Sequence, residues 1–190
     1  MADQDKNNSI LVGIPKDALS QDPGRRSTKR FAGRLKSDGK YRNRHTMLEK
    51  VSNFWMKGVL EQSLYGMTLI PRRTKMIDIF EQAGGKLLIV RLPGSGKTTL
   101  LLELTRDLNA SAEQDEALPI PVVFNLSSWG EKPLALAKWL VEELCVRYEV
   151  SRKVGTTWVE NDNLLLLFDG LDELEAEDRA ACVEAINLYC

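Results

Sequence analysis

The sequence predicts an α/β protein whose parallel sheet has about three strands and is flanked by helices. Three short apolar runs of strand length, residues 86–90, 120–126 and 164–168, are each followed by a segment of helical character. Strands that alternate with helices in this way usually form a parallel sheet with helices packed on its faces. No internal repeat interrupts the pattern.

The predicted helices carry apolar residues at helical spacing. Leucines recur in this way over residues 98–108, and Pro133 is well placed to open a helix that runs to about Tyr148. A last helix begins near Glu177. Residues 109–118 and 149–163 are predicted to be polar connections.

The predicted strands and helices form a domain that covers residues 83–190 and is expected to be incomplete. Two further regions precede it. Residues 1–40 are polar and charged without a sustained apolar period, which predicts a disordered arm. Residues 41–82 are predicted to be a helical linker, since the apolar residues of its main segment recur near helical spacing. These residues are Met47, Val51, Phe54, Trp55, Val59 and Leu60.

Composition narrows the possible functions. The net charge of −1 gives no overall attraction to nucleic acid or membrane, although nine Lys or Arg and one acid lie between Arg25 and Arg44. We interpret that basic segment as a solvated linker, with contact to nucleic acid or anionic lipid as the alternative. The N-terminus lacks the features of a signal peptide and the longest apolar run is too short to span a bilayer, so a cytoplasmic location is expected. The three cysteines are expected to be reduced thiols. The single histidine, His45, lies far along the chain from the other candidate residues, which argues against a Ser–His catalytic pair and a His-rich metal site.

Residues 92–99 (LPGSGKTT), between the first strand and its helix, have the composition of a phosphate-binding loop. A helix N-terminus offers unsatisfied N–H groups and roughly half a positive charge, and glycines let the backbone approach an anion closely. Lys97 adds a full charge toward the β- and γ-phosphates, and Thr98 places a hydroxyl on Mg²⁺. The fold class therefore narrows to that of a P-loop NTPase. The predicted nucleotide-binding residues are Pro93, Gly94, Ser95, Gly96, Lys97, Thr98 and Thr99.

One position departs from the pattern G-x-x-x-x-G-K-[ST]. Arg91 stands where the first glycine is expected, and a residue with a side chain does not readily adopt a positive φ. Either the Arg91 side chain points to solvent and leaves the loop intact, or it distorts the loop. We expect binding that is retained but weakened.

A carboxylate, Asp169, ends the apolar strand at 164–168 and is followed by Gly170, Leu171, Asp172 and Glu173. Mg²⁺ prefers oxygen ligands and is often held by one or two carboxylates together with phosphate oxygens. Asp169 and Thr98 are therefore the predicted metal-binding residues. Asp172 and Glu173 are the predicted catalytic residues, which orient the attacking water or accept its proton. The alternative is a strand end followed by acids that start the next helix.

These motifs resemble those of the NACHT NTPases, which belong to the signal-transducing STAND class of P-loop proteins. Residues 169–173 (DGLDE) are similar to their Walker B motif, and residues 92–99 are similar to their Walker A motif, apart from Arg91. Residues 121–129 (PVVFNLSSW) resemble the second strand and following loop of bacterial, especially cyanobacterial, members. Residues 41–64 resemble the linker helix before the domain, so the resemblance covers residues 41–190.

The resemblance implies that the chain binds ATP or GTP with Mg²⁺, hydrolyses it slowly and uses it as a switch for oligomerisation, in bacteria often in defence against phage. The implied partners are the nucleotide, further copies of the chain, or a full-length relative. Family members have another strand after Walker B, which lies between the strands of the two Walker motifs. Since the sequence stops at Cys190, we expect a fragment. If the chain is not a fragment, the strands of the two Walker motifs either pair directly with each other or leave a gap with unpaired backbone groups.

A second hypothesis is a non-enzymatic interaction module. In that case the incomplete sheet and Arg91 prevent catalysis, and the helix at 41–64 and the basic arm bind a partner protein or nucleic acid. Nucleotide hydrolysis that is abolished by Lys97→Ala would favour the first hypothesis.

Overall fold

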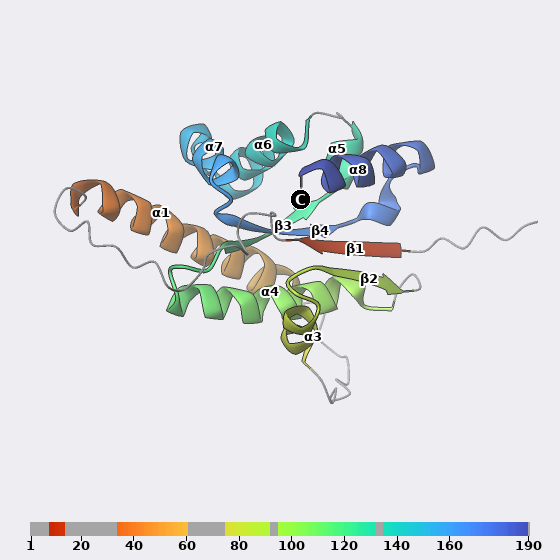
Figure 1. The fold of residues 1–190 in the computed structure, drawn as a ribbon, viewed down its shortest axis with the longest axis horizontal. Helices are drawn as coiled ribbons and strands as arrows, with labels where there is room; N and C mark the ends of the chain where they lie inside the picture. Colours follow the sequence, from red (N-terminus) through yellow and green to blue (C-terminus); the bar gives the residue numbers. More distant parts are fainter. Residues whose placement is uncertain (1–7, 14–33, 61–74, 92–94, 132–134, 190) are drawn as a thin grey trace, which may run out of the picture.

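A computed structural model describes residues 8–13, 34–60, 75–91, 95–131 and 135–189. Helices cover both faces of one sheet, so the α/β class is confirmed (Figure 1). One face carries α1 (Arg34–Val51), α3 (Met76–Gln82) and α4 (Lys97–Gln114). The other carries α5 (Ser127–Glu131), α6 (Leu136–Tyr148), α7 (Arg152–Glu160) and α8 (Ala176–Tyr189). A π-helical segment, η1 (Ser52–Leu60), continues α1, and a 3₁₀ turn, η2 (Leu171–Glu173), precedes α8.

The sheet has four strands in the order β2 (Leu87–Arg91), β1 (Asn8–Gly13), β4 (Leu164–Asp169) and β3 (Ile120–Asn125). β3 and β4 are parallel, and their carboxyl ends meet where Asn125 lies opposite Asp169. β1 is antiparallel to both of its neighbours. The three predicted strands are present, and β1 is an additional one.

β1 differs from our expectation for the N-terminal arm. Residues 1–40 were predicted to be disordered, but they contain β1 and the start of α1. β1 also fills the position between β2 and β4, so these strands neither close up nor leave a gap. The apolar residues Ile10, Leu11 and Val12 suit a strand, and their backbone pairs with groups of β2 and β4 that would otherwise lack partners.

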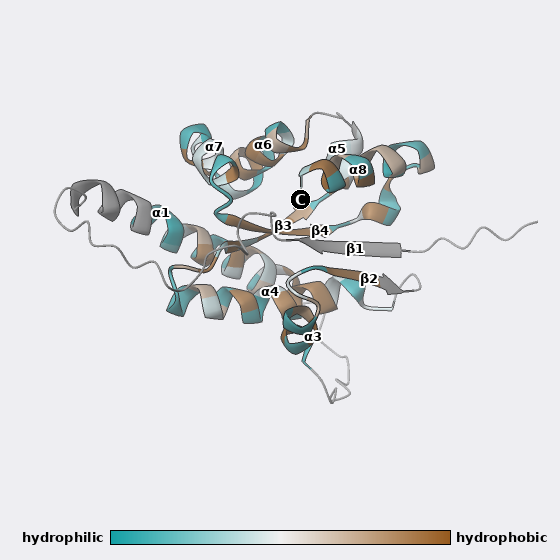
Figure 2. Ribbon diagram, in the orientation of Figure 1, coloured by the Kyte–Doolittle hydropathy of each residue, from teal (hydrophilic) through white to brown (hydrophobic). Residues whose placement is uncertain are grey.

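The core of the described fold lies on both sides of β3 and β4. Leu166, Leu167 and Phe168 of β4 have no exposed surface, and Figure 2 shows the apolar colouring of both strands. Strands covered on both faces appear in a sequence as continuous apolar runs, which is why the pattern predicted them. None of the helices in the described ranges is long and apolar enough to cross a membrane.

In the predicted linker region, residues 41–82, a helix is present as α1 and η1, and it packs on the domain. Met47, Leu48, Val51 and Trp55 are buried in the same core as the sheet. Arg44 Nη2 donates to Ala112 O of α4 at 2.7 Å, and Trp55 Nε1 donates to Tyr148 Oη of α6 at 2.8 Å. The helix begins earlier than predicted, at Arg34, and residues 61–74 lie outside the described ranges.

The predicted polar connection at 149–163 contains the helix α7. Trp158 and Val159 are buried there, and the partly buried Val154 packs against the same core. The helix was missed because its nine residues include only a few apolar positions among polar ones.

Candidate nucleotide-binding site

The glycine-rich segment, residues 91–98, joins the carboxyl end of β2 to the first turn of α4. Gly96 is the N-cap of α4 with a φ of 78°, in the left-handed region that glycine adopts without strain. The helix N-terminus therefore points its first N–H groups toward this segment. Pro93 and Gly94 lie outside the described residues, as does the side chain of Arg91, so the expectations for them stay predictions.

Thr98 and Asp169 are 71 residues apart in the sequence and in contact in the structure. Thr98 Oγ1 donates a hydrogen bond to Asp169 Oδ2 at 3.0 Å. Lys97 is buried, with 7% of its surface exposed, and its positive charge partly offsets the burial that raises the pKa of the Asp169 carboxyl. The fold thus brings together a hydroxyl, an ammonium group and a carboxylate that the sequence had assigned to one site.

The position of β1 helps to set this arrangement. Because β2 and β4 both pair with β1, they are separated by two strand spacings, about 10 Å. Helix α4 follows β2, and its first turn then lies within hydrogen-bond distance of the carboxyl end of β4.

Opposing effects act on the Asp169 carboxyl. Burial raises its pKa, and the negative charge of Asp172 adds to this effect. Hydrogen bonds from Thr98 Oγ1 and from the Gly170 amide, 3.0 Å from Oδ1, act in the other direction, as does Lys97. Partial burial, together with the charges of Asp169 and Asp172, also raises the pKa of Glu173. A cation placed beside these carboxylates would therefore stabilise their ionised forms.

The donor set fits Mg²⁺ in particular. Thr98 and Asp169 offer a hydroxyl and a carboxylate side by side, and Mg²⁺ prefers such oxygen ligands. Within the described ranges no group of three or more His, Cys, Asp and Glu side chains forms a metal cluster. A metal ion at Thr98 and Asp169 would complete its coordination with phosphate oxygens and water, as Mg²⁺ commonly does.

The acidic segment, residues 169–173, turns sharply after β4. Gly170 has a φ of 81°, and a Cβ on it would lie 3.1 Å from Asn125 Oδ1 and 3.2 Å from Glu173 Oε2. The Glu173 amide donates to Gly170 O at 3.0 Å, which closes the turn. Both the conformation and the space thus favour glycine at position 170. Asp172 and Glu173 follow within this turn and remain accessible to solvent.

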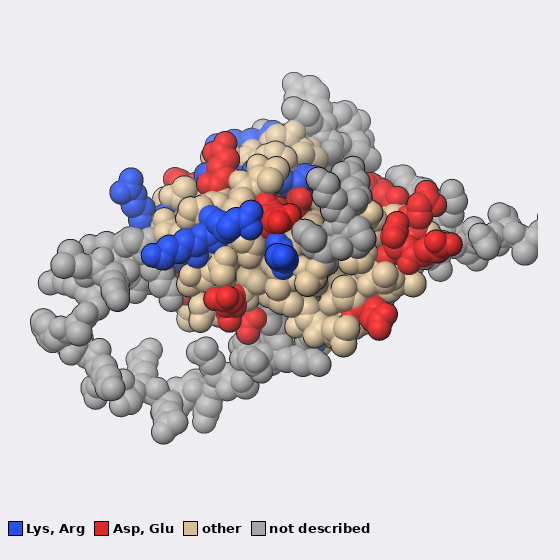
Figure 3. Space-filling model, turned by 90° about the horizontal axis from the view of Figure 1, so that it is seen from above, with Lys and Arg blue, Asp and Glu red and all other residues tan. Residues whose placement is uncertain are grey.

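Acidic side chains gather at the end of the molecule that holds this turn. Figure 3 shows them at the right, over η2 and the start of α8, whose first turn contains Glu177 and Asp178. A nucleoside triphosphate that approaches this end of the molecule would meet negative charge. Local attraction would therefore have to come from Lys97 and the N-terminus of α4.

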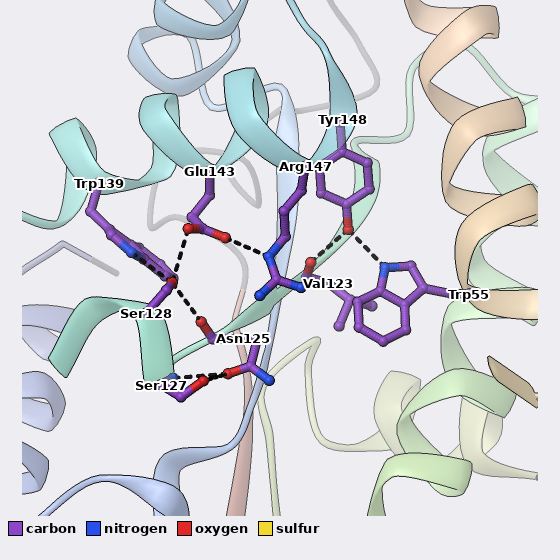
Figure 4. A network of polar contacts seen from close by, with 9 residues as sticks. All are labelled: Trp55, Val123, Asn125, Ser127, Ser128, Trp139, Glu143, Arg147 and Tyr148. Atoms are coloured by element: carbon purple, nitrogen blue, oxygen red, sulfur yellow. Dashed lines mark hydrogen bonds and ion pairs between the residues drawn. The ribbon is translucent and has the colours of Figure 1, made fainter. Parts of the chain in front are cut away.

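Residues 121–129 contribute a polar network that the sequence did not assign to the site. Asn125, opposite Asp169, accepts hydrogen bonds at Oδ1 from the backbone amide and the hydroxyl of Ser127 (Figure 4). Ser128 Oγ lies 3.1 Å from Asn125 O and 2.9 Å from Glu143 Oε1. The sequence signal for this network is the stretch PVVFNLSSW, in which polar residues follow directly after an apolar strand.

Glu143 is the charged member of this network. It has 8% of its surface exposed, and Arg147 Nε donates to its Oε2 at 2.8 Å. Trp139 Nε1 donates to Ser128 Oγ at 3.2 Å on the other side (Figure 4). The buried charge is therefore paired, as stability requires, and it ties α5 and α6 to the carboxyl end of β3.

An open cavity of about 360 Å³ lies elsewhere, between η1 and α6. Its lining residues are Lys50, Asn53, Phe54, Arg147, Tyr148 and Glu149. None of these belongs to the glycine-rich or the acidic segment.

The site has the features of a P-loop NTPase. A glycine-rich segment joins a strand to a helix whose first residue is a buried lysine, and the first turn of this helix contacts the carboxylate at the end of another strand. A family model described as the NACHT domain matches residues 88–187, more than half of the chain. The chain therefore belongs to the NACHT family, which confirms the resemblance inferred from its motifs. No curated protein and no solved structure matches the chain.

Proposed function

We propose that this chain binds a nucleoside triphosphate with Mg²⁺, ATP being the expected nucleotide and GTP the alternative. The observation that carries the proposal is the contact of Thr98 with Asp169, beside the buried Lys97 at the start of α4. These groups come from two separate elements and meet where a helix N-terminus favours a phosphate. The NACHT match supports the same class of ligand.

In this proposal each residue has a separate role. Lys97 and the first amides of α4, with residues 93–99, hold the phosphates, and Thr98 and Asp169 hold Mg²⁺. The ion would neutralise phosphate charge and orient the terminal phosphate. Asp172 and Glu173 orient a water molecule for slow hydrolysis, and Glu173, whose pKa is raised by burial, is the proposed proton acceptor.

Nucleotide state would then act as a switch in a cytoplasmic signalling protein that forms oligomers. Free thiols at Cys145 and Cys182 are compatible with a reducing compartment. The switch would act through the acidic segment, because Asp169 pairs with Asn125 in the sheet and Asn125 belongs to the polar network of α5 and α6.

Calorimetry with MgATP and MgGTP tests the binding site. Lys97→Ala should weaken binding by about 10- to 100-fold, because it removes a charge-assisted bond to phosphate. Lys138→Ala on α6, an exposed lysine, is the matched control and should leave the affinity unchanged. Equal heats for the original chain and Lys97→Ala would refute the assignment.

Hydrolysis is tested separately with Glu173→Gln. The variant should bind MgATP normally and turn it over at least about tenfold more slowly, since an amide is a poor proton acceptor. Unchanged turnover would remove Glu173 from the mechanism and leave the binding site standing.

The interaction-module hypothesis finds less support. It places partner binding on the helix at 41–64 and on the basic arm, and Met47, Val51 and Trp55 of that helix are buried against the domain. Phe54 is exposed over 45% of its surface, so a partner could reach this member of the stripe.

A further inference from the structure

Arg179, in the first half of α8, donates three hydrogen bonds to the turn that follows Asp169. Its Nε lies 3.2 Å from Leu171 O, and its Nη2 lies 3.2 Å from Asp172 O and 2.9 Å from Leu174 O. A single guanidinium group thus holds three carbonyls of residues 171–174. These contacts bridge α8 and η2, which have no continuous helix between them.

Arginine suits this role better than any other residue. Its planar group offers five N–H donors in a fixed arrangement, so it reaches several carbonyls without a change of conformation. A lysine places its three donors on one flexible atom and cannot reproduce the same spread. The side chain is half-buried, and its bonds are therefore partly shielded from competing water.

The end of the turn has a second attachment. Leu174 packs against α5 so closely that a Cβ on Gly130 would lie 2.6 Å from Leu174 Cδ2. The backbone of the turn is thus held by Arg179, and the Leu174 side chain packs on α5. Asp172 and Glu173 lie in the sequence between Leu171 and Leu174, whose carbonyls both accept from Arg179.

We propose that Arg179 is a positioning residue that holds Asp172 and Glu173 in place for hydrolysis without touching the nucleotide. The inference rests on the proposed function, because it presumes that these two acids orient the attacking water. Misplacing a reacting group by about 1 Å can lower a rate by about 100-fold. Loss of the three bonds should therefore slow turnover while binding stays intact.

The test compares Arg179→Gln and Arg179→Lys with two controls. Ile186→Val, which trims a buried residue of the same helix, controls for lost stability, and Arg152→Lys controls for a change at an exposed arginine. Single-turnover hydrolysis of MgATP should fall about 10- to 100-fold in both Arg179 variants. The Kd for MgATP should stay within about twofold, and both controls should match the original chain in rate.

Hydrogen exchange in the chain without nucleotide gives a readout that does not depend on activity. The Glu173 amide, which donates to Gly170 O, should exchange faster in Arg179→Gln than in Ile186→Val. Unchanged exchange, or faster exchange with an unchanged rate of hydrolysis, would overturn the inference. A chain that binds MgATP but hydrolyses none would overturn it too and leave the proposed binding intact. Equal binding heats for the original chain and Lys97→Ala would instead refute the proposed function itself.

Discussion

Tyr148→Phe tests whether the linker helix is a structural part of the domain. The Tyr148 hydroxyl donates to Val123 O of β3 at 2.6 Å and accepts from Trp55 Nε1 of η1 at 2.8 Å. Burial raises the pKa of Tyr148, so the hydroxyl stays protonated and keeps its donor role. The substitution leaves a buried acceptor and a buried donor without this partner, each at a cost of about 1–3 kcal/mol. We expect the free energy of unfolding to fall by about 2–4 kcal/mol.

Urea denaturation measures this loss from the shift in midpoint. Tyr189→Phe is the matched control, since the Tyr189 hydroxyl donates to Val159 O at 3.1 Å in a less buried position and should cost about 1 kcal/mol or less. Combining Tyr148→Phe with Trp55→Phe should cost less than the sum of the two, because both remove the same bond. A loss for Tyr148→Phe no larger than that for Tyr189→Phe would refute the docking of η1 on α6 and β3.

Three other changes test the sheet and the acidic segment. Gly170→Ala should lower stability by about 1–3 kcal/mol in urea denaturation, through its positive φ and the nearby Asn125 Oδ1; a neutral result would show that the turn relaxes freely. Asp169→Asn should make the protein in EDTA more stable near pH 7, because burial raises the pKa of Asp169 and its ionisation therefore disfavours the folded state. The gain should shrink as pH falls through the folded-state pKa toward the ordinary value of 3.8, and a gain that is constant with pH would contradict this. Deletion of residues 1–13 should lower stability by about 3 kcal/mol or more through lost β1 pairing, whereas deletion of residues 1–7, which keeps β1, should have little effect.

The sequence predicted those parts of the fold whose signals are local. β3 and β4 are continuous apolar runs because both of their faces are covered, and such runs are visible without a structure. Thr98 and Asp169 were expected to belong to one site, because Mg²⁺ bound to phosphate takes a hydroxyl after the glycine-rich segment and a carboxylate at a strand end.

The features that the sequence missed depend on distant partners. The six residues of β1 lie among polar ones, and their strand conformation depends on pairing with β2 and β4, far along the chain. Arg179 is one of many charged residues on helices, and its importance comes from three carbonyls that only the folded turn presents to it. Neither feature leaves a periodic pattern.

The charges around Asp169 explain why the proposed site should require a metal ion. Asp172 acts on Asp169 as a like charge, and both act on Glu173, while Lys97 is the cation that opposes them at Asp169. A triphosphate adds more negative charge to this region, so ATP without metal would be repelled by the carboxylates that Mg²⁺ would otherwise neutralise. Calorimetry in EDTA should therefore show ATP binding at least about tenfold weaker than MgATP binding. Asp169→Asn should bring the two affinities closer together. Loss of a metal ligand should weaken MgATP binding, and loss of a repelling charge should strengthen the binding of ATP without metal. Equal affinity for ATP with and without Mg²⁺ would show that phosphate binding at α4 does not involve Asp169.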